Sequence, residues 1–478
     1  GLGPSPWDLQ RLESMGLDRY IQQQLNPQSL RNPPWLDQKL QQFSTLRQSA
    51  YQIYQTAHPR QVRLARLSAQ PRQQAQTSED RKAQRQAKVK QVLQNRAMET
   101  PAQQRAIEAQ VMRPLNEAIE ARILRAINSP RQLEEVMVHF WFNHFNVSSR
   151  KNFSRMWVGI YEESALRPYA LGSFRQMLGA TAHHPAMLYY LDNWRSKAAA
   201  LNENYARELL ELHTLGVDGG YSQKDVMEVA RVFTGWRYVD MNPQRQARVG
   251  QTLPQYPDFL FDERVHDSGS KTVLGQTIRG SGLAEGEQVL DLLANHPATA
   301  RHLSYKLAQY FVADDPPASL VNNLAQVFQS SQGNIKAVLT QLFASAEFWD
   351  ARYQGQKFKT PYEYILSAAR ALGDRQVNSL QMAGMMRQLG MPLYGCETPD
   401  GYKNTQAAWL SPEAMMRRLS LANSLARSGP EGGGSSRTAQ LEQVVGQMLS
   451  ARTRTVLQSS PASLRAAAIL GSPEMMMR

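Results

Sequence analysis

Apolar residues recur every three or four positions along most of the chain, which is the spacing of an amphipathic helix. The spacing is clearest in residues 106–128 and 132–145, and it returns over most of residues 284–427. Residues 258–278 differ, because the segments F-L-F-D-E-R-V-H and K-T-V-L-G-Q-T-I flank a D-S-G-S turn, a pattern that predicts two paired strands. The sequence therefore predicts a mainly α fold: a large multi-helix assembly with one small β-hairpin near 258–278.

Proline breaks, composition and glycine content divide the chain into segments. Two Asn-Pro steps interrupt the first helices, and Pro114 is expected to kink or interrupt the helix of residues 106–128. The run S-G-P-E-G-G-G-S-S, which starts at Ser428, is typical of a linker. The expected segments are an N-terminal helical cap (1–59), a basic Gln-rich insertion or arm (60–105), a central helical core with a polar helix pair (106–256), the hairpin (257–283), a second helical region (284–427), a flexible linker (428–439) and C-terminal helices (440–478).

The net charge of +13 comes mostly from one segment. Residues 60–105 contain eleven Lys or Arg and three acids, so eight of the thirteen net charges lie there. The segment is rich in Gln and Ala and poor in aromatic residues, which is typical of an exposed helix or arm rather than a nucleic-acid groove with stacking rings. A solvated basic segment is favoured, and polyanion binding stays open as an alternative.

The chain lacks the sequence patterns of several function classes. No stretch approaches the ~18 consecutive apolar residues of a membrane-spanning helix, and no phosphate loop, nucleophile elbow or HExxH motif is present. The single cysteine, Cys396, excludes an intramolecular disulfide and a cysteine-based metal cluster, so a metal would need His and carboxylate ligands. No basic-then-apolar leader follows Gly1, which leads us to expect a processed or trimmed chain.

Residues 202–216, N-E-N-Y-A-R-E-L-L-E-L-H-T-L-G, hold the strongest candidate site. Glu208 and Glu211 share one face of the predicted helix, where two carboxylates can hold a divalent cation or supply a general base. His213 adds an imidazole, but five residues separate it from Glu208, about 140° around a regular helix. The structural alternative is ordinary ion pairing of Arg207 with the acids four residues before and after it.

The next predicted helix, residues 224–232, carries a second polar group. Ser222 and Asp225 have the spacing of a capping box, which assigns Asp225 to the helix start. Glu228 and Arg231 remain as candidate catalytic residues, because a charged stripe that faces the first helix would form a buried network.

Histidines supply two further candidates. His144 follows the aromatic residues of H-F-W-F-N-H-F and is a better ligand candidate than His139, although a hydrogen-bonded core histidine is the commoner role there. At the hairpin tip, an imidazole, a carboxylate and an ammonium group can meet, against the alternative of simple turn chemistry. The candidate catalytic residues are Glu208, Glu211, Glu228, Arg231, His266, Asp267 and Lys271, and the candidate metal ligands are His144, Glu208, Glu211 and His213.

Several strings resemble, in order, a bacterial family called domain of unknown function 1800. They are F-W-F-N-H-F (140–145), the string of 202–216, Y-S-Q-K-D-V-M-E-V-A-R-V-F-T-G-W (221–236), H-D-S-G-S-K (266–271), H-P-A-T-A-R (296–301) and K-F-K-T-P-Y-E (357–363). The resemblance spans nearly the whole chain and implies a bacterial protein that is periplasmic or secreted. It also implies a partner of the sulfatase-like domain of unknown function 1501 family. Residues 60–105 look like an insertion specific to one lineage.

Three functions follow as hypotheses. The first is an exported helical enzyme that uses a divalent metal for hydrolysis or oxidation, with its site between residues 202–216, residues 224–232 and His144. The second is a non-catalytic envelope scaffold in which the same polar helices form buried ion pairs. The third is polyanion binding through residues 60–105.

Overall fold

The structure is a computed structural model that describes residues 2–68, 99–239, 251–279, 282–427 and 433–478. Its described part is mainly helical with two small antiparallel sheets, which confirms the predicted fold class. No helix in these ranges is both long and apolar enough to cross a membrane. Most of the predicted basic segment and the start of the predicted linker lie outside the described residues.

The helices follow one another with short connections. The α-helices are α1 (Pro6–Met15), α2 (Leu17–Gln24), α3 (Pro34–Gln41), α4 (Ala50–Ala57), α5 (Pro59–Ser68), α7 (Pro101–Asn128), α8 (Gln132–His144), α9 (Ser154–Tyr161), α10 (Phe174–His183), α11 (Pro185–Tyr190), α12 (Asn204–Glu208), α13 (Gln223–Val232), α15 (Leu283–Ala294), α16 (Pro297–Phe311), α17 (Ala318–Ser330), α18 (Ile335–Ala344), α19 (Ala346–Trp349), α20 (Pro361–Ala371), α21 (Ser379–Gln388), α22 (Gln406–Trp409), α23 (Pro412–Arg427), α24 (Gly433–Val445), α25 (Ala451–Ser459), α26 (Ala462–Leu470) and α27 (Pro473–Met476). Shorter turns are the 3₁₀-helices η1 (Pro27–Ser29), η2 (Ser44–Arg47), η4 (Arg167–Tyr169), η5 (Asn193–Arg195), η7 (Glu263–Val265) and η8 (Gly446–Met448), and the π-helices η3 (Glu162–Leu166) and η6 (Leu209–His213).

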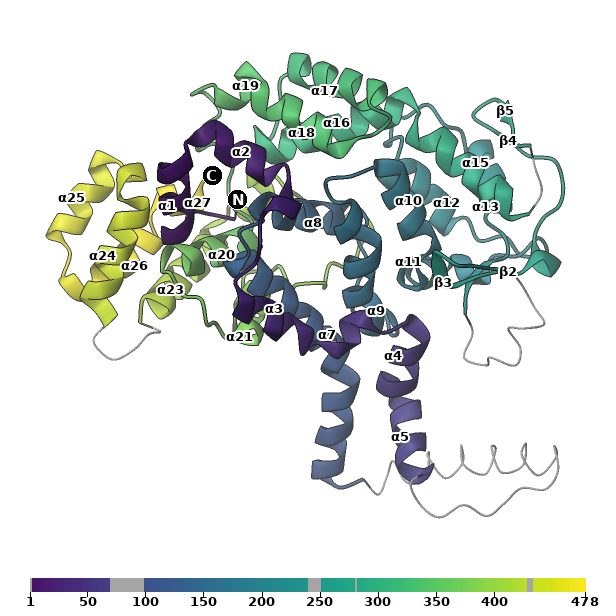
Figure 1. Cartoon of the computed structure of the whole chain (residues 1–478), viewed down its shortest axis with the longest axis horizontal. Helices are drawn as coiled ribbons and strands as arrows, with labels where there is room; N and C mark the ends of the chain where they lie inside the picture. The colour runs from purple at the N-terminus through teal and green to yellow at the C-terminus, as the bar shows by residue number, and fades with distance from the viewer. Residues whose placement is uncertain (1, 69–98, 240–250, 280–281, 428–432) are drawn as a thin grey trace.

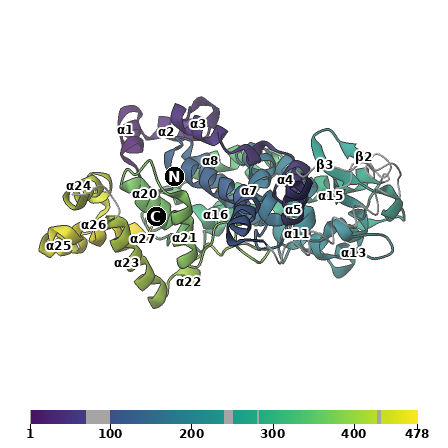
Figure 2. The same cartoon turned by 90° about the horizontal axis from the view of Figure 1, so that it is seen from below.

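Helix α8 lies at the centre of the molecule, with α7, α2 and η3 packed against it (Figure 1). The sheets with α10, α11 and α13 form one end, and α23 to α26 form the other. The two chain ends lie near each other in both views (Figures 1 and 2), where Arg370 of α20 donates a hydrogen bond to the Gly3 carbonyl and Met477 bridges to Phe358. The core around α8 is therefore enclosed by segments from the whole length of the chain.

Helix α7 continues through Pro114 from residue 101 to residue 128, so the predicted interruption is wrong. Pro114 is buried, and the helix packs against α4, α5, α9, α20 and α21 along its length. These contacts offset the hydrogen bond that proline cannot donate. In Figure 1 the first half of α7 projects beside α4 and α5.

The strands pair differently from the predicted hairpin. Strand β3 (Tyr256–Phe261) lies between β1 (Trp236–Tyr238) and β2 (Gln251–Leu253) in an antiparallel sheet, with Arg237 opposite Leu260. A small hairpin does lie within 258–278, but it consists of β4 (Thr272–Val273) and β5 (Gln276–Thr277). Leu274 and Gly275 both have positive φ at its turn, as a two-residue hairpin turn requires.

The C-terminal region is divided more finely than its periodicity suggests. Helix α24 begins at Gly433, inside the predicted linker of 428–439, because its buried face packs against α26 and α20. The predicted C-terminal helices of 440–478 comprise the end of α24, then η8, α25, α26 and α27. Helix α23 begins at Pro412, and the Ser411 hydroxyl accepts a hydrogen bond from the Ala414 amide.

Candidate functional site

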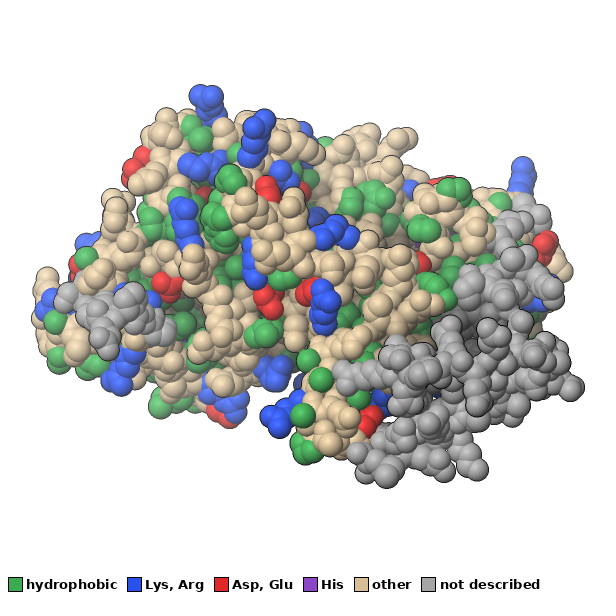
Figure 3. All heavy atoms as spheres, turned by 60° about the horizontal axis from the view of Figure 1, so that its bottom comes forward, with side chains coloured by type: hydrophobic (Ala, Val, Ile, Leu, Met, Phe, Trp, Pro, Cys, Tyr) green, Lys and Arg blue, Asp and Glu red, His purple; other side chains and the backbone are tan. Residues whose placement is uncertain are grey.

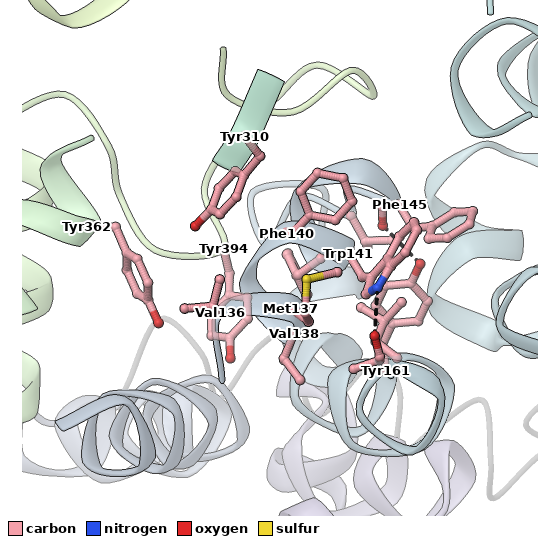
Figure 4. Close-up of a cluster of buried hydrophobic side chains, with 14 of the residues drawn as sticks. Val136, Met137, Val138, Phe140, Trp141, Phe145, Tyr161, Tyr310, Tyr362 and Tyr394 are labelled. Atoms are coloured by element: carbon pink, nitrogen blue, oxygen red, sulfur yellow. Dashed lines mark hydrogen bonds between the residues drawn. The ribbon is translucent and has the colours of Figure 1, made fainter. Parts of the chain in front are cut away.

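Helix α8 carries the aromatic centre of the core. Phe140, Trp141 and Phe145 are buried, and Figure 4 shows Trp141 and Phe145 on one side of this cluster and Tyr310 on the other. His144 is the last residue of α8, and its ring meets that of Phe145 edge to face at 4.6 Å between centroids. The aromatic packing therefore fixes the orientation of the imidazole.

A cavity of about 230 Å³ lies against this end of α8. It is smaller than a typical drug-sized pocket, which is ~300 Å³ or more, so it suits a small molecule. Its walls come from α8, from α16 and from the loop that follows residue 390. The polar residues in the wall include His139, His144, His302, Lys306, Asp400 and Lys403.

The hydrogen bonds of His144 determine its tautomer. Nε2 lies 3.1 Å from the backbone carbonyl oxygen of His213, and because a carbonyl oxygen only accepts, Nε2 carries the hydrogen. Nδ1 therefore keeps a lone pair and accepts a hydrogen bond from Lys306 Nζ at 3.1 Å. Burial and the neighbouring Lys306 ammonium hold the pKa of His144 well below its usual range, so the ring is neutral.

Lys306 is a partly buried amine that faces the cavity. Among the described residues it forms no ion pair with a carboxylate, and its Nζ donates a hydrogen bond to His144. Burial, reinforced by Lys403 and opposed by Asp400, lowers the pKa of Lys306 to about 8. A desolvated lysine with a lowered pKa is the usual source of a nucleophilic or basic amine in proteins.

His139 is held in the same manner on the far wall of the cavity. Arg122 donates to its Nδ1 at 2.8 Å and to Glu162 at 2.8 Å, and the Tyr394 hydroxyl donates to Glu162 at 2.9 Å. The His139 ring stacks on Tyr362 at 4.1 Å between centroids. Burial and the Arg122 charge lower the pKa of His139 to about 3, so both histidines of H-F-W-F-N-H are neutral.

The polar segment 202–216 borders the cavity, but it is not one regular helix. Its first half is α12, and its second half is the π-helix η6, so the prediction of a regular helix is wrong there. In a π-helix the backbone hydrogen bonds join residues i and i+5, so a spacing of five residues no longer corresponds to about 140° around the helix axis. The π-turn presents the His213 carbonyl to His144, while Leu212 lines the cavity. Gly216 has φ of 86°, as expected of a left-handed helix end.

The two predicted carboxylates of this segment are more exposed than His213. His213 is 2% exposed with its ring 5.1 Å from that of Phe145, whereas Glu208 and Glu211 are half-buried. Burial first, then Glu211 and Asp400, raise the pKa of Glu208 to about 6. Glu208 forms no ion pair with any described residue, because Arg207 pairs with the acid four residues earlier, Glu203, at 3.1 Å.

The four candidate metal ligands do not form one ligand set. The rings of His144 and His213 are 6.2 Å apart, and both nitrogens of His144 are already hydrogen-bonded. In the described parts of the chain, no three His, Cys, Asp or Glu side chains are placed to hold a metal ion.

The predicted catalytic residues near the hairpin do come together. Arg231 of α13 binds Asp267 at 2.9 Å and Glu228 at 3.0 Å, and Lys271 binds Glu285 of α15 at 2.7 Å. Every charge of this group has a partner, which ties α13 and α15 to the turn. This is the arrangement of a structural ion-pair cluster.

His266 completes that cluster. Its Nε2 lies 3.3 Å from Glu285, and its Nδ1 lies 2.9 Å from the carbonyl of Thr234. The predicted capping box is confirmed nearby, since Ser222 and Asp225 exchange hydrogen bonds at the start of α13. Asp225 also accepts from the Leu274 amide, which fixes the β4–β5 hairpin to α13.

Lys306 and His302 were missed by reasoning from the sequence. They are four residues apart in H-L-S-Y-K and therefore share one face of α16, the same signal that singled out Glu208 and Glu211. What the sequence could not supply is the partner segment: His144 is 162 positions away along the chain.

The fold and the site define a large helical protein with a lysine and neutral histidines around a small central cavity. The family described as Protein of unknown function (DUF1800) matches residues 1–477, and the chain belongs to that family. No curated protein and no solved structure matches the chain.

Proposed function

We propose that this chain is an enzyme whose active site is the central cavity and whose reactive group is the Lys306 amine. The observation that carries the proposal is the hydrogen bond from Lys306 to a neutral His144, with no carboxylate among the described residues ion-paired to the ammonium group. A lysine in this setting is partly neutral near pH 8, and its lone pair is free to take a proton or attack a substrate.

His144 acts as a positioning residue in this proposal. Its Nδ1 accepts one Nζ hydrogen, so the nitrogen lone pair of a neutral Lys306 is directed away from the ring. The π-helix holds the ring in that tautomer through the His213 carbonyl. π-helical turns occur frequently at functional sites, which supports the assignment.

An amine-based site replaces the metal-based site in our proposal because the donor atoms of His144 are engaged. The exported location and the partner of the 1501 family stay in the proposal, and both rest on the family resemblance. An envelope scaffold is the second candidate, favoured by the fully paired cluster around Arg231 and Lys271.

Limited acetylation separates the two candidates. Acetic anhydride is added in trace amounts at about pH 8, and the acetylated fraction of each lysine is measured by peptide mass spectrometry. The exposed Lys224 serves as the reference. An active-site amine predicts that Lys306 reacts on the order of tenfold faster than Lys224, because a large fraction of the Lys306 amine is neutral at this pH. A Lys306 that reacts no faster than Lys224 would contradict the proposed function.

A further inference from the structure

The cavity wall has one more positive charge than negative charge when Lys306 is protonated, which favours the binding of one anionic group. Two ammonium groups, Lys306 and Lys403, face a single wall carboxylate, Asp400. Asp400 already accepts a hydrogen bond from Lys403 at 2.7 Å, and the wall histidines His139 and His144 are neutral. An anion that enters the cavity therefore meets a cationic centre at Lys306 with no carboxylate of its own.

A third histidine of the wall adds no positive charge. His302 lies one turn before Lys306 on α16, with its ring 6.3 Å from that of His144. Its Nε2 is buried and has no hydrogen-bond partner among the described atoms, and the residue lines the same cavity. Burial, followed by the Lys306 charge, lowers the pKa of His302 to about 4, so its ring is neutral near neutral pH.

We propose that the cavity takes a small 2-oxo acid and that Lys306 Nζ adds to its carbonyl carbon to form a Schiff base. The proposal rests on the proposed function, since it names the substrate class of the same site. The carboxylate of such a compound pairs with the ammonium form of Lys306, and its carbonyl carbon is the electrophile that the neutral form, also present near pH 8, attacks. The volume of about 230 Å³ accommodates a compound of a few carbon atoms.

The chemical step balances without an oxidant or a metal. The lone pair of neutral Nζ forms a carbon–nitrogen bond, and the carbonyl π electrons move to oxygen. One Nζ proton moves to that oxygen, which gives a carbinolamine. The hydroxyl group then leaves as water with the second Nζ proton while the nitrogen lone pair completes the carbon–nitrogen double bond, so amine and ketone yield imine and water.

Reductive trapping tests the proposal on the full chain. The protein is incubated with pyruvate and sodium cyanoborohydride, and peptide mass spectrometry locates and quantifies the reduced adduct. We expect one adduct per chain, at Lys306, with occupancy on the order of tenfold above that of any other lysine. Acetone, a ketone without a carboxylate, should give much less adduct at Lys306 under the same conditions.

Two variants serve as controls. Lys306→Arg should abolish the main adduct, and circular dichroism checks that the variant is folded. Lys224→Arg, an exposed position outside the cavity, should leave the trapping unchanged.

Each contrary result has a distinct meaning. Adducts spread evenly over surface lysines, or no adduct at Lys306, would overturn the Schiff-base proposal. Equal trapping of acetone and pyruvate would overturn the 2-oxo acid as the substrate class. If Lys306 is acetylated rapidly but pyruvate is not trapped, only this inference fails. If Lys306 also reacts like Lys224 toward acetic anhydride, the proposed function fails with it.

Discussion

The Glu162→Gln substitution tests the buried ion pairs that support the cavity wall. Glu162 and Arg122 are 2% and 3% exposed, and the Glu162 carboxylate also accepts hydrogen bonds from Arg167 at 3.1 Å and Tyr394 at 2.9 Å. A glutamine there has one acceptor oxygen where the carboxylate has two, and its amide group would present hydrogens to other donors. The Arg122 guanidinium would then lack a carboxylate partner and keep the His139 ring, the Tyr362 hydroxyl and aromatic faces.

The expected cost follows from this burial. Removing one partner of a buried pair leaves an uncompensated charge and costs about 3 to 5 kcal/mol. With a urea m-value of about 3 kcal/mol/M, the unfolding midpoint falls by about 1 M or more. The matched control is Glu413→Gln, which breaks an exposed pair with Arg417 on α23. That pair is worth only about 0.3 to 0.5 kcal/mol.

Urea unfolding followed by circular dichroism measures both variants against the parent chain. The predicted result is a large loss for Glu162→Gln and almost none for Glu413→Gln. Equal midpoints for the two variants would refute the reasoning, because they would show that the Arg122 charge does not need its buried carboxylate.

Three further predictions concern the cavity and its rim. Lys306→Met should stabilise the protein below pH 8, because the parent chain then buries an ammonium group. This gain in stability should shrink as pH rises from 8 towards 10.5, where the lysine of the unfolded chain also loses its proton. Thermal unfolding of both proteins across this pH range measures the change. Glu208→Gln should leave the stability of the protein unchanged below pH 4.5 and raise it above pH 6, because the raised pKa of Glu208 means that the fold disfavours its charged form. A strong loss of stability at pH 7 would instead support the envelope scaffold with buried ion pairs. Gly401→Ala should lower the melting temperature more than Gly355→Ala. Both glycines have positive φ, but only at Gly401 would the added methyl group overlap the Asn143 carbonyl oxygen. Equal losses would contradict the close approach of this loop to α8.

Local signals in the sequence predicted most elements of the fold. The spacing of apolar residues in 132–145 predicted a helix, and α8 is that helix. The Ser222–Asp225 capping box and the start of α23 at Pro412 also follow from local chemistry. These features depend on residues within one or two turns, so the sequence alone determines them.

The errors arise where distant contacts decide the structure. Helix α7 continues through Pro114 because other helices pack along it, and β3 pairs with β1 and β2 rather than with the following segment. The π-helix η6 cannot be recognised from the spacing of apolar residues. It alters the angle around the helix axis that separates Glu208 from His213 five residues later.

The candidate site also combines features that local sequence predicts with features that depend on distant contacts. The segment 202–216 contributes Leu212 to the cavity wall and the His213 carbonyl to His144, whereas the prediction rested on its carboxylates. The lysine that matters lies on α16, and only the fold brings it to His144.

The titration of the Lys306 amine tests the central claim most directly. With lysine labelled by ¹³C at Cε, the resonance of residue 306 is assigned by its absence in Lys306→Arg and followed by NMR as pH rises. The account predicts a midpoint near pH 8 for Lys306. A Lys306 midpoint at about 10.4, the ordinary value of a lysine side chain, would contradict the assignment of Lys306 as the reactive group.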